Sequence, residues 1–538
     1  MNTEAAAVLA ALRSAPRNDA ALISVYDRAG AVPLARALAE RGVPIYATGG
    51  TCAHLREHGI DARDVGELTG YPSLFDGRVK TLHPNVFGGI LHDRDDPTHR
   101  EEAQRHRIPT ISTVVVNLYP FESTVAREGA TLQEAIEQID IGGVALLRAA
   151  SKNFDHVTVL SDPGQYDAFV AALAHGGLDH AARRRCATLA FERTAEYDSA
   201  IARYLESGLL ANELPGSLAL TIPIEQPLRY GENPQDRAAF YLAREAQLPE
   251  QLGGKALSYN NLLDLDATLR LLVRAPLGRD DEGAVPHVPP QRARAAIVKH
   301  TVPCGVAERA TVADAVREAL DADPVSAYGG IIAVDDRLDL AAAEHLAEFF
   351  LEIVAAPAFD DDALARLRKK KNLRIMRYRP GTPERIAREL RVRSALGGVL
   401  AEDDDPQAPP ERWAVVSKRQ PSSEQWRDLI FAWDVVRHVK SNGVVVARDG
   451  VSRGICAGQT NRVSAVQIAA HRAHAFVTGA ACASDGFFPF ADGLIAAAEA
   501  GCGAVIAPRG SIRDAEVVAA ADERDVALVF STYRYFLH

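Results

Sequence analysis

The sequence has few cysteines, very few methionines and tryptophans, and no long apolar run. Its 538 residues include 6 cysteines, 2 methionines and 3 tryptophans, and no two cysteines form a C-x-x-C pair. This scatter is untypical of a disulfide framework or a cysteine metal cluster and indicates a reducing compartment, so we expect a cytoplasmic protein. Because no apolar stretch approaches the roughly 18 residues that a membrane-spanning helix needs, we expect no membrane partner.

The sequence also lacks an excess of positive charge. Asp and Glu number 71 against 60 Lys and Arg, which leaves a net charge of -11. A negative net charge disfavours polyanions, so nucleic acid is not an expected partner. The first 20 residues lack the basic start and the apolar centre of a secretory leader, and we expect a short helical or frayed extension there.

What the chain does have is an alternation of β-rich and helical segments from residue 21 onward, with glycine or proline at the changes. At this length two domains are expected, and the alternation is typical of α/β domains with a parallel sheet. We place the first domain at residues 21–215 and the second at residues 220–538. Within the second, residues 277–291 predict an exposed loop, and the segment 432–458 predicts a hairpin with a polar turn at Arg448, Asp449 and Gly450. The segments "IVKHT" and "HVKSN", each interpreted as a strand ending on lysine, hint at a duplicated subdomain.

Two segments of the first domain combine glycines with cations. In "YATGGT", Gly49 and Gly50 follow an apolar run and precede a helical pattern, which lets backbone N–H groups approach an oxyanion. In "GRVKTLHP", Arg78 and Lys80 fall on one face of an extended segment. Together the segments predict a phosphate-binding site, although a tight turn and a basic edge strand also explain each segment taken singly.

Three further residues of the first domain suit proton transfer. Tyr119 follows an apolar strand pattern, Asp140 precedes a second Gly-Gly pair, and Lys152 follows one helical stretch later. A phenol, a carboxylate and lysines around a phosphate pocket can transfer protons and stabilise developing negative charge. For the tyrosine and the aspartate taken singly, a packed ring and a helix cap are the simpler interpretations.

The order of these motifs carries a family resemblance. "SVYDRAG", "ATGGT", "GRVKTLHP", "NLYPF", "IDIGG" and "LLRAASKN" resemble, in this order, the inosine monophosphate (IMP) cyclohydrolase domain of the bifunctional purine biosynthesis protein family. The rest of the chain resembles the family's phosphoribosylaminoimidazolecarboxamide (AICAR) formyltransferase domain in "RYGENP", "GKALSYNNLLDLDA", "VKHTVPCG", "DPVSAYGGIIA", "VKSNGVVVARDG", "CAGQTNR", "SDGFFPF" and "YRYFLH".

The resemblance implies a fold and two reactions. The implied fold is a methylglyoxal-synthase-like parallel-sheet domain, followed by a cytidine-deaminase-like region of two related subdomains. The implied reactions are formyl transfer from 10-formyltetrahydrofolate to AICAR, and cyclodehydration of the formylated product (FAICAR) to IMP. These are the last two steps of purine biosynthesis. The expected partners are the nucleotide and folate substrates and a second copy in a homodimer, with no zinc or other metal site but room for a monovalent cation.

For the second domain, the resemblance assigns the proton acceptor to His300, charge stabilisation to Lys299, and hydrogen bonding of the formyl or amine group to Asn442. The matched positions around nucleotide or folate are Arg229, Tyr230, Gly329, Glu352, Arg462, Phe487, Asp492 and Arg534.

For the first domain, the resemblance assigns the main proton-transfer role to Lys152, supported by Lys80, Tyr119 and Asp140. The residues that the resemblance places around the substrate are Ser24, Thr48, Gly49, Gly50, Thr51, Arg78, Thr81 and Asn117.

Several positions depart from the family pattern. Val302 stands where asparagine is common, and "NPQD" replaces "NPHQ" after Glu232, so the alternative is a cyclohydrolase with weakened or altered use of the formyl donor. In the first domain Tyr26 replaces a small hydroxyl residue, Arg28 a lysine and Ala145 a threonine. These three changes predict rearranged ligand contacts.

Two rivals remain from other functional classes. A zinc nucleobase deaminase is suggested by "PCG", but Ala307 stands at the position of its second cysteine and no H-x-E accompanies the motif. We therefore interpret Cys304 as a packing thiol. The other rival is a nucleotide sensor that keeps the pockets without the chemistry.

Overall fold

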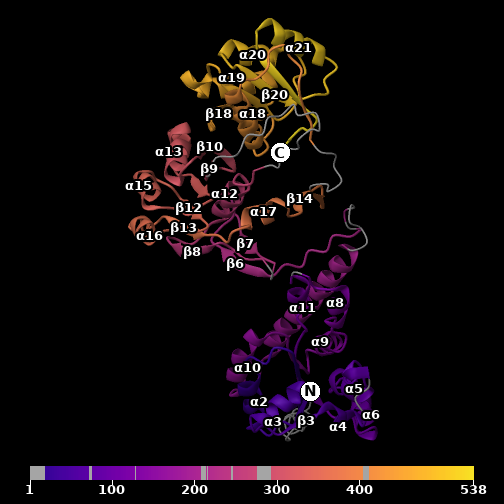
Figure 1. Cartoon of the computed structure of the whole chain (residues 1–538). Helices are drawn as coiled ribbons and strands as arrows, with labels where there is room; N and C mark the ends of the chain where they lie inside the picture. Colours follow the sequence, from indigo (N-terminus) through magenta and orange to yellow (C-terminus); the bar gives the residue numbers. More distant parts are fainter. Residues whose placement is uncertain are drawn as a thin grey trace. The chain divides into compact units, whose positions relative to one another are not determined.

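The chain folds into two units, which the computed structural model describes over residues 19–71, 75–127, 129–207, 214, 216–243, 246–274, 293–403 and 411–538. Unit 1 comprises Met1–Pro223 with Ala243–Glu245, and unit 2 comprises Ile224–Leu242 with Ala246–His538 (Figure 1). The predicted N-terminal extension, apart from its last two residues, and the predicted loop at 277–291 lie outside the described residues.

Unit 1 is built on a five-stranded parallel sheet in the order β3-β2-β1-β4-β5. Both faces of the sheet are buried, because successive residues of β1 alternate between two hydrophobic clusters: Ala21 and Ile23 pack in one, and Leu22 packs in the other. The strands are β1 (Ala20–Val25), β2 (Ile45–Ala47), β3 (Ala62–Asp64), β4 (Ile111–Asn117) and β5 (Thr158–Leu160).

Helices cover both faces of this sheet. Leu34 of α2 and Phe169 of α10 pack in one cluster, and Ile90 of α5 and Leu146 of α9 pack in the other. The helices of unit 1 are α2 (Ala31–Ala39), α3 (Gly49–Glu57), α4 (Val65–Thr69), η1 (Phe75–Gly77), α5 (Pro84–Leu91), α6 (Pro97–Arg105), α7 (Phe121–Val125), α8 (Leu132–Glu137), α9 (Gly142–Lys152), η2 (Pro163–Gln165), α10 (Tyr166–Leu173) and α11 (His180–Ser207).

Unit 2 contains a twelve-stranded mixed sheet in the order β16-β21-β20-β19-β17-β18-β10-β9-β11-β12-β13-β8. Two separate hairpins pair β6 with β7 and β14 with β15. The strands are β6 (Ile224–Leu228), β7 (Ala238–Tyr241), β8 (Glu250–Gly253), β9 (Ala293–Lys299), β10 (Val302–Arg309), β11 (Ile331–Val334), β12 (Ile353–Ala356), β13 (Arg374–Arg377), β14 (Arg391–Ala395), β15 (Gly398–Glu402), β16 (Trp413–Val415), β17 (Val444–Arg448), β18 (Val451–Cys456), β19 (Ala481–Ser484), β20 (Ala504–Pro508) and β21 (Ala527–Ser531).

Three hydrophobic clusters fix the helices of unit 2 to its large sheet. α13, α15 and α16 share one cluster with β9, α19, α20 and α21 share another with β17, and α12 and α18 pack together on the opposite face. The helices are α12 (Tyr259–Arg270), α13 (Val312–Ala322), α14 (Pro324–Ala327), α15 (Leu340–Glu348), α16 (Asp361–Arg368), α17 (Thr382–Ala387), α18 (Ser423–Val436), α19 (Arg462–Arg472), η3 (His474–Val477), α20 (Asp492–Ala500) and α21 (Asp514–Glu523).

The large sheet consists of two halves with the same topology. Each half has a helix, an antiparallel hairpin, three parallel strands separated by helices, and one antiparallel edge strand. The hairpins β9–β10 and β17–β18 meet at the centre, where Ala307 pairs with Val451. Gly305 and Gly454 show the same close packing, since a Cβ at either would lie 2.0 Å from a helix carbonyl oxygen, of Ala319 and Ala469 respectively. The α/β class and the two related subdomains are confirmed.

The match of "IVKHT" with "HVKSN", which suggested the duplication, was nevertheless wrong, because the two lysines are not equivalent in the fold. Lys299 ends strand β9, whereas Lys440 lies between α18 and β17 and ends no strand. The hairpin predicted within 432–458 is present as β17 and β18. The turn equivalent to His300–Thr301 is therefore Asp449–Gly450. Among the described residues, no helix is both long and apolar enough to span a membrane.

Candidate functional site

A cavity of about 1060 Å³ opens in unit 1 beyond the carboxyl ends of β1, β2 and β4. The sheet order changes direction between β1 and β4, and open α/β sheets bind ligands at such a switch point. The sequence-predicted residues that line the cavity are Ser24, Thr48, Gly50, Thr51, Arg78, Lys80, Thr81, Asn117, Tyr119 and Asp140.

One end of the cavity is suited to an anion. Helix α3 begins there at Gly49, and its N-cap residue Thr48 makes no side-chain capping bond to the first turn. A Cβ at Gly49 would lie 3.4 Å from Lys80 Nζ, and one at Gly50 would lie 3.0 Å from the Arg28 guanidinium. Two cations thus lie beside the positive end of a helix, an arrangement that binds phosphate.

Tyr119 and Asp140 lie beside this anion site. Burial raises the pKa of Asp140, against the opposing effects of backbone hydrogen bonds from Gly143 and Tyr119 and of the charge of Lys80. Burial also raises the pKa of Tyr119, and the charge of Asp140 adds to that rise. The ring of Tyr26, one of the departures from the family pattern, meets the Tyr119 ring edge-on at 5.7 Å between centroids.

Several predicted substrate-binding side chains hold the walls of the cavity together. The Asn117 side-chain oxygen accepts from the backbone N–H groups of Tyr26 (2.6 Å) and Asp27 (2.9 Å). Ser24 and Thr48 share a hydroxyl hydrogen bond of 2.9 Å. These groups shape the cavity through the backbone segments that they fix.

Lys152, predicted to transfer protons, does not line the cavity. It is exposed and is the last of the 11 residues of α9, whose first residue, Gly142, lines the cavity. A rise of 1.5 Å per residue places Lys152 roughly 15 Å farther along the helix axis. The role of Lys152 stays a prediction.

Sequence reasoning missed the acidic and apolar part of the lining. Glu137 accepts from Arg78 Nη2 at 2.8 Å through each carboxylate oxygen, and Ile136 and Ile141 are exposed apolar residues of the lining. Ile141 directly precedes "GG" at 142–143, and Ile136 and Glu137 lie six and five positions before it, so nearness to that motif was the available signal.

In unit 2, Lys299 and His300 lie at the turn of the β9–β10 hairpin. His300 and Thr301 both adopt left-handed backbone conformations, with φ of 55° and 59°. Lys299 Nζ donates to Tyr328 O at 2.7 Å. Val302, a departure from the family pattern, pairs directly with Lys299 across the hairpin.

Gly329 and Glu352 lie in segments next to this turn. Gly329 follows Tyr328, has a φ of 78°, and donates its N–H to Phe350 O at 2.8 Å. The carboxylate of Glu352 pairs with Arg374 at 2.5 Å. The Glu352 carboxylate is therefore fixed by its ion pair with Arg374.

Asn442 belongs to a second group of contacts. Its side-chain N–H donates to Gln459 O at 2.8 Å, and the preceding Ser441 bonds Asp485 Oδ2 at 2.6 Å. Asp485 also pairs with the buried Arg462. The C-terminal tail joins this group, since Ser441 N donates to Leu537 O at 2.8 Å.

The turn at His300 and the contacts of Asn442 lie at the same edge of the large sheet, namely an edge formed by the ends of its strands. β9 ends at Lys299, and β17, which runs antiparallel to β9, begins at Val444 just after Asn442. Strands β10 and β18 lie between them. The topology therefore aligns His300 and Asn442 along one sheet edge.

The remaining predicted residues are partly or fully exposed. Arg229 lies over the Tyr230 ring at 5.7 Å and Arg534 over the Phe536 ring at 4.8 Å. Phe487 is half-buried, and Asp492 is exposed at the start of α20. In the variant "NPQD" segment, Asp236 Oδ2 accepts from both the backbone and the side-chain nitrogen of Asn233.

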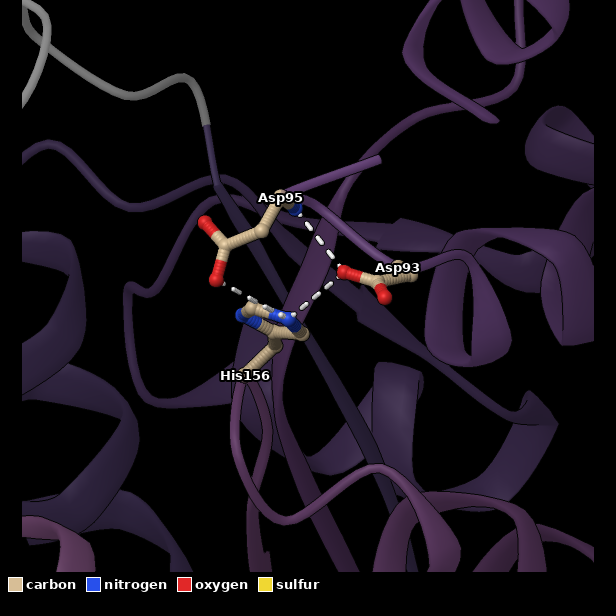
Figure 2. Close-up of side chains that lie close together, drawn as sticks. All are labelled: Asp93, Asp95 and His156. Carbon is tan, nitrogen blue, oxygen red and sulfur yellow. Dashed lines mark hydrogen bonds and ion pairs between the residues drawn. The ribbon is translucent and has the colours of Figure 1, made fainter. Parts of the chain in front are cut away.

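Two features bear on the expectation that no metal is bound. Burial, more than the neighbouring Asp323, raises the pKa of the Cys304 thiol to about 12, which disfavours a thiolate ligand. In unit 1, Asp93, Asp95 and His156 lie close enough together to hold a metal ion (Figure 2). His156 Nε2 is 3.1 Å from Asp93 and 3.9 Å from Asp95, and a surface ion pair explains these distances equally well. The absence of a metal site stays a prediction.

Comparison with known proteins places this geometry in a family. The sequence model described as "AICARFT/IMPCHase bienzyme" matches residues 150–472, and the one described as "MGS-like domain" matches residues 30–145. The latter confirms the methylglyoxal-synthase-like fold predicted for the first domain.

Three curated relatives, each a "Bifunctional purine biosynthesis protein PurH", cover nearly the whole chain. The protein of Roseobacter denitrificans is 45% identical over 535 residues, with 96% of this chain and 98% of the relative covered. That of a Synechococcus species is 46% identical over 524 residues, and that of Prochlorococcus marinus is 47% identical over 522 residues. In both, 96% of this chain and 99% of the relative are covered.

Proposed function

Because the chain belongs to the AICARFT/IMPCHase bienzyme family, we propose that its units carry the family's two reactions separately, with the cyclohydrolase in unit 1 and the formyltransferase in unit 2. The chain is a bifunctional enzyme that catalyses the last two steps of purine biosynthesis, as AICAR formyltransferase and IMP cyclohydrolase. The transferase reaction uses a folate formyl donor. The observation that carries the assignment is the similarity over 96% of the chain, which includes both candidate sites.

In unit 2 the amine of AICAR must attack a formyl carbon. The amine is a poor nucleophile, because its nitrogen is conjugated with a ring that bears a carboxamide. His300 takes the proton that the amine loses as the new C–N bond forms, and Lys299 stabilises the negative charge that develops on the formyl oxygen. The bond between the formyl carbon and the folate nitrogen then breaks, and that nitrogen takes up a proton as the folate product leaves. Asn442, at the same sheet edge, hydrogen-bonds the formyl or amine group. Holding both substrates along one edge reduces the entropic cost of their encounter.

In unit 1 the carboxamide nitrogen of FAICAR attacks the formyl carbon of the same molecule, and water is then lost. The phosphate binds at the N-terminus of α3 between Lys80 and Arg28. Tyr119 and Asp140 lie beside that position, and the raised pKa of both suits them to exchange protons with the substrate. Because ring closure is intramolecular, the shape of the cavity contributes by folding the substrate.

Further parts of the proposal concern the donor, the assembly and the location. We propose 10-formyltetrahydrofolate as the donor, with Val302 next to Lys299 as the position where donor use can differ from that of relatives. We also propose that the protein is a cytoplasmic homodimer and that it can bind a monovalent cation. Lys152 stays in it as a proton-transfer residue, although it does not line the cavity within one chain.

The test is one assay on the purified protein. AICAR and 10-formyltetrahydrofolate are supplied, and tetrahydrofolate and IMP are both followed for the wild type, His300→Ala, Asp140→Ala and Lys152→Ala. We expect both products from the wild type, neither from His300→Ala, and tetrahydrofolate with accumulated FAICAR from Asp140→Ala.

Lys152→Ala separates two versions of the cyclohydrolase site. Accumulation of FAICAR would require a second copy or a rearranged chain to bring Lys152 to the cavity. Unchanged IMP production would remove Lys152 from the site. If the wild type releases no tetrahydrofolate yet cyclises supplied FAICAR, the proposed donor is wrong and the departure at Val302 matters.

A further inference from the structure

We infer that Asp264 on α12 is a positioning residue of the transferase, because it holds the turn that carries His300. The inference deepens the proposed function, since it rests on His300 as the proton acceptor. Asp264 is half-buried, and its carboxylate accepts the backbone N–H of His300 at 3.3 Å and that of Thr301 at 2.6 Å. Both amides of the turn are therefore bound by one side chain from another element.

The turn needs such support because of its residues. A two-residue hairpin turn with both residues in the left-handed region favours Asn, Asp and Gly. Here those positions hold His300 and the β-branched Thr301, with φ of 55° and 59°. A left-handed backbone is unfavourable for such residues and persists when the surroundings hold it. The two N–H groups of such a turn point the same way and form a concave anion site, which the Asp264 carboxylate fills.

The second half of unit 2 supplies an internal comparison. The equivalent turn of the β17–β18 hairpin is Asp449–Gly450, with φ of 56° and 68°. The carboxylate of Asp428 on α18 accepts both of its amides, at 3.0 Å and 2.8 Å. The same interaction thus recurs in both halves.

The residues in the two turns differ in a way that matters. Asp-Gly is among the preferred pairs for this turn type and adopts it without outside help. The His-Thr pair carries a chemical group but has a poor intrinsic preference for the turn. We therefore expect the first turn to depend on its carboxylate more strongly than the second turn depends on Asp428.

The location of the two turns makes Asp428 a matched control. Strand β17 runs antiparallel to β9, so Asp449–Gly450 lies at the opposite edge of the sheet from His300. Asp428→Asn disturbs the same pair of backbone-to-carboxylate hydrogen bonds in the other half of unit 2. It should leave the edge that carries His300 and Asn442 unchanged.

The experiment compares Asp264→Asn with Asp428→Asn in the full chain. Asparagine keeps the size of the side chain, but its NH₂ group opposes one of the two turn N–H groups. We expect Asp264→Asn to lower kcat for tetrahydrofolate release by about 10- to 100-fold, with KM for AICAR and for the folate within about threefold. For Asp428→Asn we expect kcat within about twofold of the wild type.

A rescue tests whether backbone geometry is the cause. Thr301→Gly copies the glycine of the second turn and removes the strained β-branched residue. Alone it should leave kcat within about twofold, and combined with Asp264→Asn it should restore most of the lost rate. Asp264→Glu keeps the charge but displaces the oxygens, so it should lower kcat as well. Cyclisation of supplied FAICAR, measured in every variant, should not change.

Each failure has a distinct meaning. If His300→Ala keeps the wild-type transfer rate, the proposed function fails. If His300→Ala is inactive but Asp264→Asn has wild-type kcat, the positioning role alone is overturned. Absence of rescue by Thr301→Gly, or full activity of Asp264→Glu, would also overturn it, because Asp264 would then act through its charge. If Asp264→Asn yields no folded protein, the rescued double variant and Asp264→Glu carry the same comparison.

Discussion

Glu411 is predicted to hold the C-terminal tail of unit 2 in place. Its carboxylate accepts from the indole N–H groups of Trp413 and Trp433, both at 2.8 Å, from Ser531 Oγ at 2.5 Å and from Tyr535 OH at 2.8 Å. Tyr535 in turn leads the tail to the segment that carries Asn442, where Leu537 accepts from Ser441 N at 2.8 Å. Removing this carboxylate should weaken both stability and transfer.

The expected decrease in the free energy of unfolding follows from the burial of the groups that donate to Glu411. Trp413 and Trp433 are buried, with 4% and 1% exposed, so their indole N–H groups would lose their acceptor without access to water. Each buried donor left unsatisfied costs about 1 to 3 kcal/mol, so the free energy of unfolding should fall by about 2 to 6 kcal/mol in Glu411→Met. Glu411→Gln keeps an acceptor oxygen in place and should lose about 1 kcal/mol, because only the charge-assisted part is removed.

Tryptophan fluorescence during urea unfolding measures this effect in unit 2 alone. The chain has 3 tryptophans, Trp413, Trp426 and Trp433, and all belong to that unit. The urea midpoint should decrease from wild type to Glu411→Gln to Glu411→Met, and tetrahydrofolate release should fall in the same order. Equal midpoints for Glu411→Met and the wild type would refute the reasoning.

Three further predictions concern pH and packing. Because burial raises the pKa of Asp140, the rate of cyclisation of supplied FAICAR should fall as pH drops through that raised pKa. Asp140→Asn should remove this acid limb and cost about 10²- to 10⁴-fold in rate. Burial, with the charge of Arg437 next, lowers the pKa of His438 to about 3. The stability that the neutral imidazole contributes to unit 2 is therefore fully present above the unfolded pKa of about 6.5 and is lost as the pH falls below it. Urea unfolding should show that the free energy of unfolding decreases by about 2 kcal/mol on acidification to about pH 5. This decrease should be absent in His438→Gln. In Gly454→Ala the new Cβ would lie 2.0 Å from the Ala469 carbonyl oxygen, so β18 and α19 must separate. The same fluorescence assay should show a loss of about 3 kcal/mol, and a wild-type midpoint would contradict the packing argument.

The cavity of unit 1 could be predicted from sequence in part, because some of its residues directly follow strands. Parallel strands bring their carboxyl ends to one edge, so motifs that follow apolar runs converge there. Thr48 and Tyr119 follow β2 and β4 in this way, whereas Lys80 and Asp140 reach the cavity from the segments that precede α5 and α9. The bond between Arg78 and Glu137 could not be predicted, because it joins residues 59 positions apart through the packing of separate elements.

The positions of other groups depended on tertiary structure that no local pattern carries. The lysine of "VKSN" looked like a strand end, yet Lys440 lies after a helix, because the apolar run before it is long enough to pack as α18. Asp264 gave no signal of its own within a helical pattern, and its contact with the turn appears once α12 packs against the sheet. The duplication likewise resides in topology and in paired contacts such as those of Asp264 and Asp428.

The most direct test of the central claim, two sites in two units, is a mixing experiment with His300→Ala and Asp140→Ala. Each purified variant receives AICAR and 10-formyltetrahydrofolate, first alone and then mixed with the other, and IMP is measured. The account predicts little IMP from either variant alone and substantial IMP from the mixture, because FAICAR released by Asp140→Ala is cyclised by His300→Ala. If His300→Ala fails to cyclise FAICAR that is supplied directly, the two reactions share a site and the account is contradicted.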